Sequence, residues 1–169
     1  DNGGSQGGST ELTGTPLTVT KATDTPKHES TEVSGTWYKL SAAEMYAAVG
    51  NNDSNGVILE FKLHNSGVIS FYMGNDENCK RFVLKDGGEF VNSVQIWNAT
   101  VTVQWNGAYS EVEGIPARTL IVTIPDRNLW INGVVGYDYN NNTYNEDLYF
   151  GGNAGNQDDT IQATIRPNN

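Results

Sequence analysis

Cysteine and long apolar runs are nearly absent from this sequence. The single cysteine, Cys79, excludes a disulfide within the chain and has no second cysteine at metal-site spacing, so we interpret it as a small apolar residue in or near a strand. No apolar run approaches the roughly 18 to 20 residues that cross a membrane, and no charged segment precedes an apolar one as in a signal peptide. We therefore expect a mature chain without a membrane-spanning helix.

Basic residues and histidines are also scarce. The chain has 10 Lys and Arg against 20 Asp and Glu, and its net charge of −10 repels phosphate backbones and anionic membranes. Only two imidazoles are available: we place His28 in a linker and His64 on the solvent face of a strand, where neither is held as a catalytic base. We expect neither an enzyme nor a nucleic-acid-binding protein.

Two acidic segments have simple interpretations. A glycoside hydrolase needs two carboxylates that flank a cleft, and Glu111 and Glu113 share one face of a short segment that can turn toward a sugar. A charged strand edge that discourages aggregation is the favoured interpretation. The loop NNDSNG at residues 51–56 is similar to the start of a calcium loop, yet its twelfth position is Lys62, where a bidentate Glu is needed. We therefore expect no metal and no cofactor.

Aromatic residues and glycine are plentiful. The chain contains 4 Trp, 8 Tyr, 5 Phe and 19 Gly, a mixture that favours short strands and tight turns over helices. In VILEFKLH, Val57, Leu59 and Phe61 alternate with Glu60, which predicts a strand with one core face and one solvent face. The turn NSG at residues 65–67 leads into VISFYMG, and we expect the two strands to form a hairpin.

The rest of the chain continues this pattern. Three further turn dipeptides follow: Asp86-Gly87, Asn106-Gly107 and Asn132-Gly133. The segment QIWNATVTVQW reads as one long strand with Trp97 and Trp105 on the same face. Together these features predict an all-β fold, an antiparallel meander of about eight to ten strands closed into a barrel, with a β-sandwich of two sheets as the alternative.

The predicted organisation is a tether followed by one domain. Residues 1–32 are rich in Gly, Ser and Thr and are expected to be flexible, apart from LTVTKAT, which alternates like a short strand that docks on a sheet edge. The domain is expected over residues 33–169. One short helix is predicted in SAAEMYAAVGNN, where Ser41 is the N-cap, Glu44 completes a capping box and Gly50 ends the helix.

The tripeptide GTW, Gly35 to Trp37, opens the first core strand and precedes the helix and the series of strands. In this order, over residues 34–166, the chain resembles a lipocalin-like, or calycin-type, domain of secreted bacterial proteins. In that family the Trp plugs the closed end of an eight-stranded barrel and an Arg near the last strand lies over it. The resemblance implies that Trp37 and Arg166 have these roles, in a cation–π contact of roughly 1 to 2 kcal/mol.

The N-terminal sequence DNGGSQGGST resembles the tether that follows the acylated cysteine in surface and periplasmic lipoproteins of Bacteroidetes-type bacteria. This resemblance implies an exported protein, periplasmic or at the cell surface, with a lipid anchor as its contact with the membrane.

The predicted function is that of a monomeric, non-enzymatic binding protein with a small apolar or amphipathic ligand inside the barrel. Four aromatic strand residues are expected to line the pocket: Phe61, Phe71, Trp97 and Trp105. The alternative is a glycan-binding accessory module, in which Tyr137 and Tyr139 of the segment YDYNNNTYNEDLYF form a platform, because tyrosine rings stack on sugars and Asn amides pair with hydroxyls.

Overall fold

The structure is a computed structural model that describes residues 12–28, 30–50, 55–63, 68–73, 80–85, 93–96, 99–112, 115–136, 140–141, 147–152 and 161–169. Its strands are β1 (Thr15–Leu17), β2 (Thr20–Lys21), β3 (Lys27–His28), β4 (Thr31–Glu32), β5 (Thr36–Leu40), β6 (Val57–Leu63), β7 (Val68–Met73), β8 (Lys80–Lys85), β9 (Ser93–Ile96), β10 (Ala99–Val112), β11 (Ile115–Ile124), β12 (Leu148–Gly152) and β13 (Gln162–Pro167). Its helices are α1 (Ala42–Val49) and η1 (Leu129–Val135), a π-helix.

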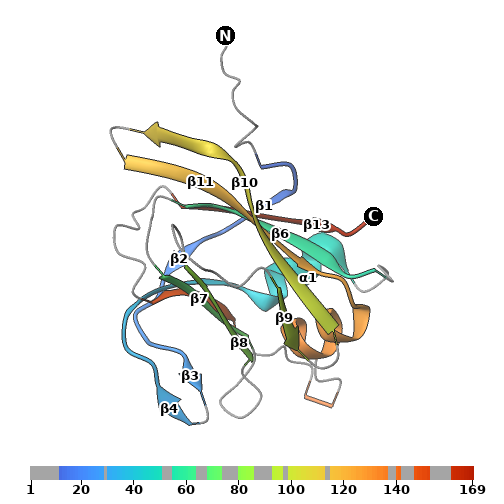
Figure 1. Cartoon of the computed structure of the whole chain (residues 1–169). Coiled ribbons are helices and arrows are strands. Elements are labelled where there is room, and N and C mark those ends of the chain that lie inside the picture. Colours follow the sequence, from blue (N-terminus) through green and yellow to red (C-terminus); the bar gives the residue numbers. More distant parts are fainter. Residues whose placement is uncertain are drawn as a thin grey trace.

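Most of the described strands form two antiparallel sheets (Figure 1). Among the described residues, the larger sheet has six strands in the order β1-β13-β6-β11-β10-β9, and the smaller has five in the order β2-β5-β12-β7-β8. Strands β3 and β4 pair separately as a small ribbon. The prediction of an all-β fold is confirmed.

The pairing differs from a meander. Strands β6 and β7, predicted to form a hairpin, lie in different sheets: β6 pairs with β11 and β13, whereas β7 pairs with β8 and β12. Alternation predicts which face of a strand is buried, but it does not predict which strand lies beside it. Neither sheet closes on itself within the described part of the chain, so closure into a barrel stays a prediction.

Aromatic rings pack together at the centre of the interior between the two sheets. Phe61 on β6 lies 5.2 Å from Phe71 on β7 and 5.0 Å from Phe150 on β12, measured between ring centroids. Each of these three rings is at most 1% exposed. Because Phe61 comes from one sheet and the other two from its partner, this contact holds the sheets face to face.

The segment predicted as a tether is ordered where the structure describes it. Strand β1 pairs with β13 in the six-stranded sheet, and β2 pairs with β5 in the five-stranded sheet. Where the structure describes it, the segment predicted as a flexible linker over residues 1–32 is therefore paired with both sheets. The single strand expected in LTVTKAT is not formed: Leu17 ends β1, and Thr20 and Lys21 form β2. The segment passes from one sheet to the other.

Helix α1 forms at the predicted place. The Ser41 hydroxyl accepts the Glu44 amide at 3.2 Å, and Gly50 ends the helix with φ 70°, a left-handed conformation that suits glycine. Helix η1 was not predicted, and the interpretation of Asn132-Gly133 as a turn is wrong, because both residues lie within it. The apolar side chains of η1 are buried, and Trp130 donates from Nε1 to the Gly50 carbonyl at 3.0 Å.

The segment QIWNATVTVQW is also not one strand. Strand β9 ends at Ile96, strand β10 begins at Ala99, and these two residues face each other in an antiparallel pair. Within β10, Val101 and Val103 are buried as the alternation predicts. Since β10 runs opposite to β9, residues on either side of positions 97–98 belong to neighbouring strands.

Candidate functional site

Trp37 is buried but does not plug the space between the sheets. The ring is 2% exposed and lies edge-on to Tyr72, with centroids 5.3 Å apart, while Nε1 donates to the Val33 carbonyl at 3.0 Å. Gly35, two residues before Trp37, has φ 141°, a backbone conformation that favours glycine. On β5 the neighbouring Tyr38 points into the core, so alternation turns Trp37 to the outer face of the five-stranded sheet.

Arg166 lies on the other sheet. Its neighbour Ile165 belongs to the core, so Arg166 faces outward from the six-stranded sheet, where its Nε is 3.8 Å from Oε2 of Glu60. The predicted cation–π contact between Trp37 and Arg166 is wrong, because the two residues lie on opposite outer faces with both sheets between them. In the described part of the chain, the cation–π contact is between Lys39 and Tyr149, at 5.8 Å.

The residues predicted to line a pocket are only partly described. The structure brings Phe61 and Phe71 together, as expected, but they contact each other and Phe150 in the packed interior. Trp105 lies on β10 opposite Leu120, and its side chain is outside the described set. Trp97, Tyr137 and Tyr139 are also outside the described residues, and with them the predicted glycan platform.

Within the described part of the chain, Glu60 is the centre of a cluster of polar contacts. It lies on the outer face of β6, as the alternation predicts, yet it is only 3% exposed because the N-terminal segment covers it. Its carboxylate accepts the amides of Thr13 and Gly14 at 2.9 and 3.0 Å, the Thr13 hydroxyl at 3.1 Å and the Thr164 hydroxyl at 2.7 Å. We call this group of residues the Glu60 cluster.

These contacts keep Glu60 ionised. Burial by itself opposes the charged form, but the hydrogen bonds from Thr164, Thr13 and Gly14 outweigh it and hold the pKa of Glu60 below its usual value. Arg166 adds a nearby positive charge, although its Nε makes no hydrogen bond to any described residue. The negative charge of Glu60 is thus locally compensated.

A second carboxylate holds the next part of the same segment. Glu44 on α1 accepts both the amide and the hydroxyl of Thr18 at 3.0 Å. The predicted capping box is therefore only half formed, since this carboxylate binds another segment rather than the start of its own helix. Thr18 lies between β1 and β2, where the chain leaves one sheet for the other.

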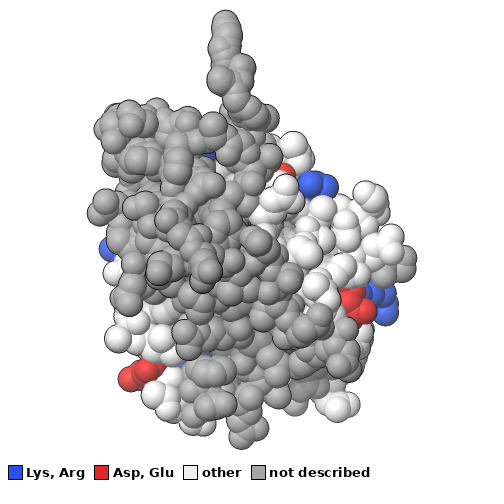
Figure 2. Space-filling view, in the orientation of Figure 1, with Lys and Arg blue, Asp and Glu red and all other residues white. Residues whose placement is uncertain are grey.

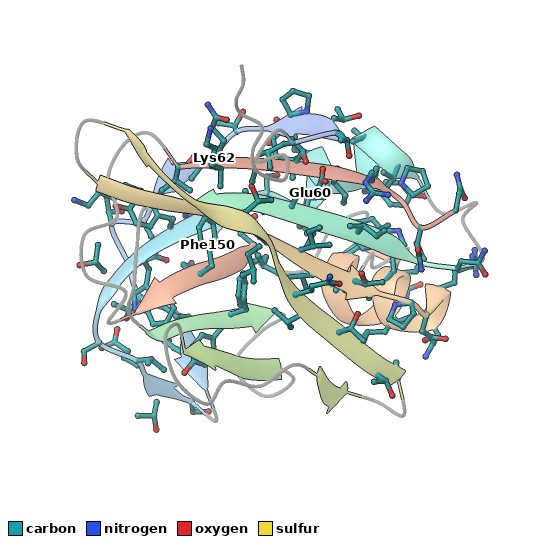
Figure 3. All side chains as sticks on the ribbon, turned by 45° about the horizontal axis from the view of Figure 1, so that its top comes forward. Glu60, Lys62 and Phe150 are labelled. Carbon is teal, nitrogen blue, oxygen red and sulfur yellow. The ribbon has the colours of Figure 1, made fainter. Side chains whose placement is uncertain are left out.

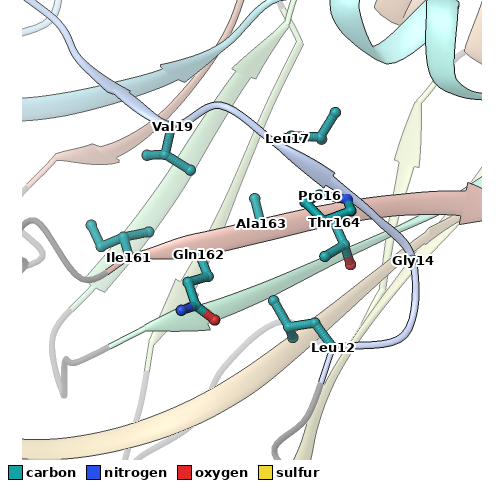
Figure 4. A pocket seen from close by; sticks show the side chains of 9 residues that line it. All are labelled: Leu12, Gly14, Pro16, Leu17, Val19, Ile161, Gln162, Ala163 and Thr164. Atoms are coloured by element: carbon teal, nitrogen blue, oxygen red, sulfur yellow. The ribbon is translucent and has the colours of Figure 1, made fainter.

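A groove opens where β1 diverges from the start of β13 (Figure 4). Its volume is about 420 Å³, within the range of small-molecule sites. It is lined by Leu12, Gly14, Pro16, Leu17, Val19, Ile161, Gln162, Ala163 and Thr164. We call it the seam groove, because one of its walls is the segment that joins the two sheets.

The seam groove has two chemically different ends. Leu17, Ile161 and Ala163 belong to the hydrophobic core, and Val19 packs against it. Gln162 and Thr164 project from the opposite side of β13 (Figure 4), and Thr164 belongs to the Glu60 cluster. The groove is therefore apolar where it joins the core, and its outer wall combines the apolar Leu12 with the polar side chains of Gln162 and Thr164, which we call the polar rim.

A different polar group borders the aromatic cluster around Trp37. The Tyr149 hydroxyl donates to Asp24 at 2.8 Å, and this hydrogen bond lowers the pKa of Asp24 although partial burial opposes it. Lys39 lies 3.8 Å from Asp24 and 3.9 Å from Asp147. We call these four residues the Asp24 group.

The described residues contain no group of three or more His, Cys, Asp and Glu side chains that could hold a metal ion. The side chains of His28 and Glu111 lie outside the described set, as do His64 and Glu113. No helix in the described ranges is long and apolar enough to cross a membrane.

The sequence interpretation missed both the Glu60 cluster and the seam groove. Each combines residues from the first 20 positions with residues more than 40 positions away, so no local pattern contains them. Alternation placed Glu60 on the outer face, but nothing in VILEFKLH indicates that another segment covers that face. The available signal was LTVTKAT, whose alternation suggested docking on a sheet edge.

Comparison with known proteins does not assign a family. No protein-family model, no curated protein and no solved structure matches the chain. The resemblance to a lipocalin-like domain therefore depends on the sequence features alone, and the function has to be argued from the site.

Proposed function

We propose that the protein is a non-enzymatic binding protein that takes a small amphipathic ligand in the seam groove. The observation that carries this proposal is the composition of the groove, which has a polar rim at Gln162 and Thr164 and an apolar end at Leu17, Ile161 and Ala163. An amphipathic molecule matches both ends, because its chain replaces water along apolar walls while its polar end stays at the rim. The ligand site thus differs from the aromatic interior, where Phe61 and Phe71 pack together.

The proposed fold is a lipocalin-like barrel that the N-terminal segment completes on one side. The support is that β1 pairs with β13 in one sheet while β2, only three residues further on, pairs with β5 in the other. This segment links the edges of the two sheets, and the seam groove lies at that link. An experimental structure tests the proposal, because a barrel requires contact between the opposite edges, β8 and β9, whereas a sandwich leaves them apart.

We also propose that the protein is exported and held by a lipid anchor. The support is the resemblance of the N-terminal sequence to lipoprotein tethers. Fractionation of source cells, with mass spectrometry of the mature N-terminus, tests it: an acylated cysteine upstream of Asp1 supports the proposal, and an unmodified cytosolic protein contradicts it.

A calorimetric titration with two ten-carbon amphiphiles, the uncharged decanol and the negatively charged decanoate, tests the binding function. Val19→Asp puts a charge on the apolar wall and is expected to weaken binding of both by more than about tenfold. The matched control is Val33→Asp, because Val33 is also a partly buried valine but packs on the Trp37 cluster. Circular dichroism verifies that both variants are folded at the temperature of the titration.

Binding that is lost in Val19→Asp and kept in Val33→Asp supports the seam groove. Absence of binding, or equal effects of the two substitutions on folded protein, contradicts it. A parallel titration with oligosaccharides separates the alternative: a response to sugars alone, lost on Tyr137→Ala and Tyr139→Ala, makes the glycan-binding module the better account.

A further inference from the structure

Lys62 lies beside the polar rim of the seam groove. Strands β6 and β13 pair in a register that places Thr164 opposite Glu60 and Gln162 opposite Lys62. The first pair has its side chains in contact, since the Thr164 hydroxyl donates to Glu60 at 2.7 Å. The second pair is two residues further along the same strands, so Lys62 and Gln162 share that outer face and are neighbours. Figure 3 shows Glu60 and Lys62 following one another along β6.

The ammonium group of Lys62 has no anionic partner among the described residues. Lys39 lies near Asp24 and Asp147, and Arg166 lies near Glu60, but no described carboxylate comes within 4 Å of Lys62. The residue as a whole is partly buried. Among the described residues on the face seen in Figure 2, charged side chains are scattered rather than gathered in a basic patch.

On the outer face of β6 and β13, the described charged side chains beside the rim are Lys62, Arg166 and Glu60, whereas the chain as a whole is acidic. Glu60 is compensated by Arg166 and by its hydrogen-bond donors, which leaves the charge of Lys62 as the uncompensated one in this part of the described surface. The net charge of −10 is spread over the whole molecule, and at physiological salt it is screened beyond about 8 Å. Among the described residues, Lys62 is therefore the cation beside Gln162 that lacks an acidic partner.

We propose that the ligand of the seam groove carries a carboxylate head group. The Lys62 ammonium and the Gln162 side-chain amide donate hydrogen bonds to the carboxylate at the rim, and the apolar chain follows Val19, Ile161 and Ala163 inward. This inference depends on the proposed binding function and adds the chemistry of the ligand's polar end.

The test compares decanoate with decanol, which have the same chain length and differ in the charge of the head group. In the wild-type protein, decanoate is expected to bind at least about tenfold more tightly than decanol, because the hydrogen bond to its head group is charge-assisted. Lys62→Gln is expected to remove this preference by lowering the affinity for decanoate to about that for decanol, and Lys62→Arg is expected to retain the preference. Lys85→Gln is the control, since it also removes one positive charge, but from β8, an edge strand of the five-stranded sheet, whereas Lys62 is on the six-stranded sheet.

The preference of the wild-type protein for decanoate over decanol can be measured without any variant. It should decrease as the salt concentration rises. Equal binding of decanoate and decanol, or a preference that survives Lys62→Gln, overturns the carboxylate inference and leaves the seam groove intact as a site. Failure of both amphiphiles to bind, or insensitivity of both to Val19→Asp, overturns the proposed function itself.

Discussion

The N-terminal segment is attached to the outer faces of the two sheets by different chemistry. On the six-stranded sheet, a buried carboxylate gathers the segment's donors: the side chain of Glu60 is 5% exposed and binds Thr13 and Gly14. On the five-stranded sheet, the segment covers Trp37 and its aromatic neighbours, and the carboxylate of Asp24 stands at the margin with 59% of its side chain exposed. The same chemical group is thus central to one attachment and peripheral to the other.

This difference in burial determines how much each carboxylate contributes to the stability of its attachment. In a buried site, the loss of one partner leaves desolvated donors unpaired, whereas at the surface water replaces a lost partner. Aromatic burial supplies the stability of the second attachment instead, because a buried indole removes a large apolar area from water. Four substitutions or conditions separate these contributions.

Trp37→Ala is expected to have the largest effect. It removes a ring that is 2% exposed, with its contact to Tyr72 and its hydrogen bond to Val33, and should lower the free energy of unfolding by about 3 to 5 kcal/mol. Urea denaturation measures the change. Trp37→Phe is the control, since it keeps an aromatic ring against Tyr72 and should cost clearly less. A small effect of Trp37→Ala would show that the aromatic face does not hold the segment.

Glu60→Gln tests the first attachment. The amide keeps the shape of the side chain but turns an NH₂ group toward the donors of Thr13 or Thr164 and leaves Arg166 without its counter-charge. A loss of about 2 to 4 kcal/mol is expected. The matched substitution Glu44→Gln removes the charge from an exposed pair of bonds to Thr18 and should cost less than about 1 kcal/mol. Equal effects would contradict the role assigned to burial.

Local features of the fold were predictable from the sequence, and features made by distant segments were not. The caps of α1 at Ser41 and Gly50 are local signals, and alternation placed Phe61 and Phe71 in the interior. Alternation also placed Glu60 on the outer face, but it carries no information about the segment that covers that face. The π-helix was missed because its Asn132-Gly133 dipeptide is typical of a turn, while burial against α1 stabilises a helix there.

The candidate site was beyond prediction for the same reason. The two walls of the seam groove, residues 12–19 and 161–164, meet only because β1 joins the edge of β13. Trp37 and Arg166 illustrate the opposite error, since a family resemblance brought together two residues that alternation places on opposite outer faces. Pairing between strands distant in sequence depends on the complete set of packing contacts, which no single segment contains.

Acid should weaken the first attachment before the second. The pKa of Glu60 is lowered from 4.5, so its contribution is fully present above that pH and is lost as the pH falls through the folded-state value. The pKa of Asp24 is also lowered, but from 3.8, and the Asp24 side chain is more exposed than that of Glu60. Denaturation measured from neutral pH downward should therefore show a loss of stability below about pH 4.5 that is largely absent from Glu60→Gln. A slope that persists in Glu60→Gln would assign the acid sensitivity to other carboxylates.

Asp24→Asn is expected to have the smallest effect and completes the comparison. The substitution removes a charge near Lys39 and weakens the bond from the Tyr149 hydroxyl, but an amide oxygen can still accept that bond. Since the Asp24 side chain is mostly exposed, its electrostatic contribution is screened by solvent and the free energy of unfolding should fall by less than about 1 kcal/mol. Tyr149→Phe serves as the partner substitution, because it removes the same hydrogen bond from the other side and keeps the ring. If either substitution destabilised the protein as strongly as Glu60→Gln, the second attachment would depend on its carboxylate, and the distinction between a buried and a peripheral carboxylate would fail.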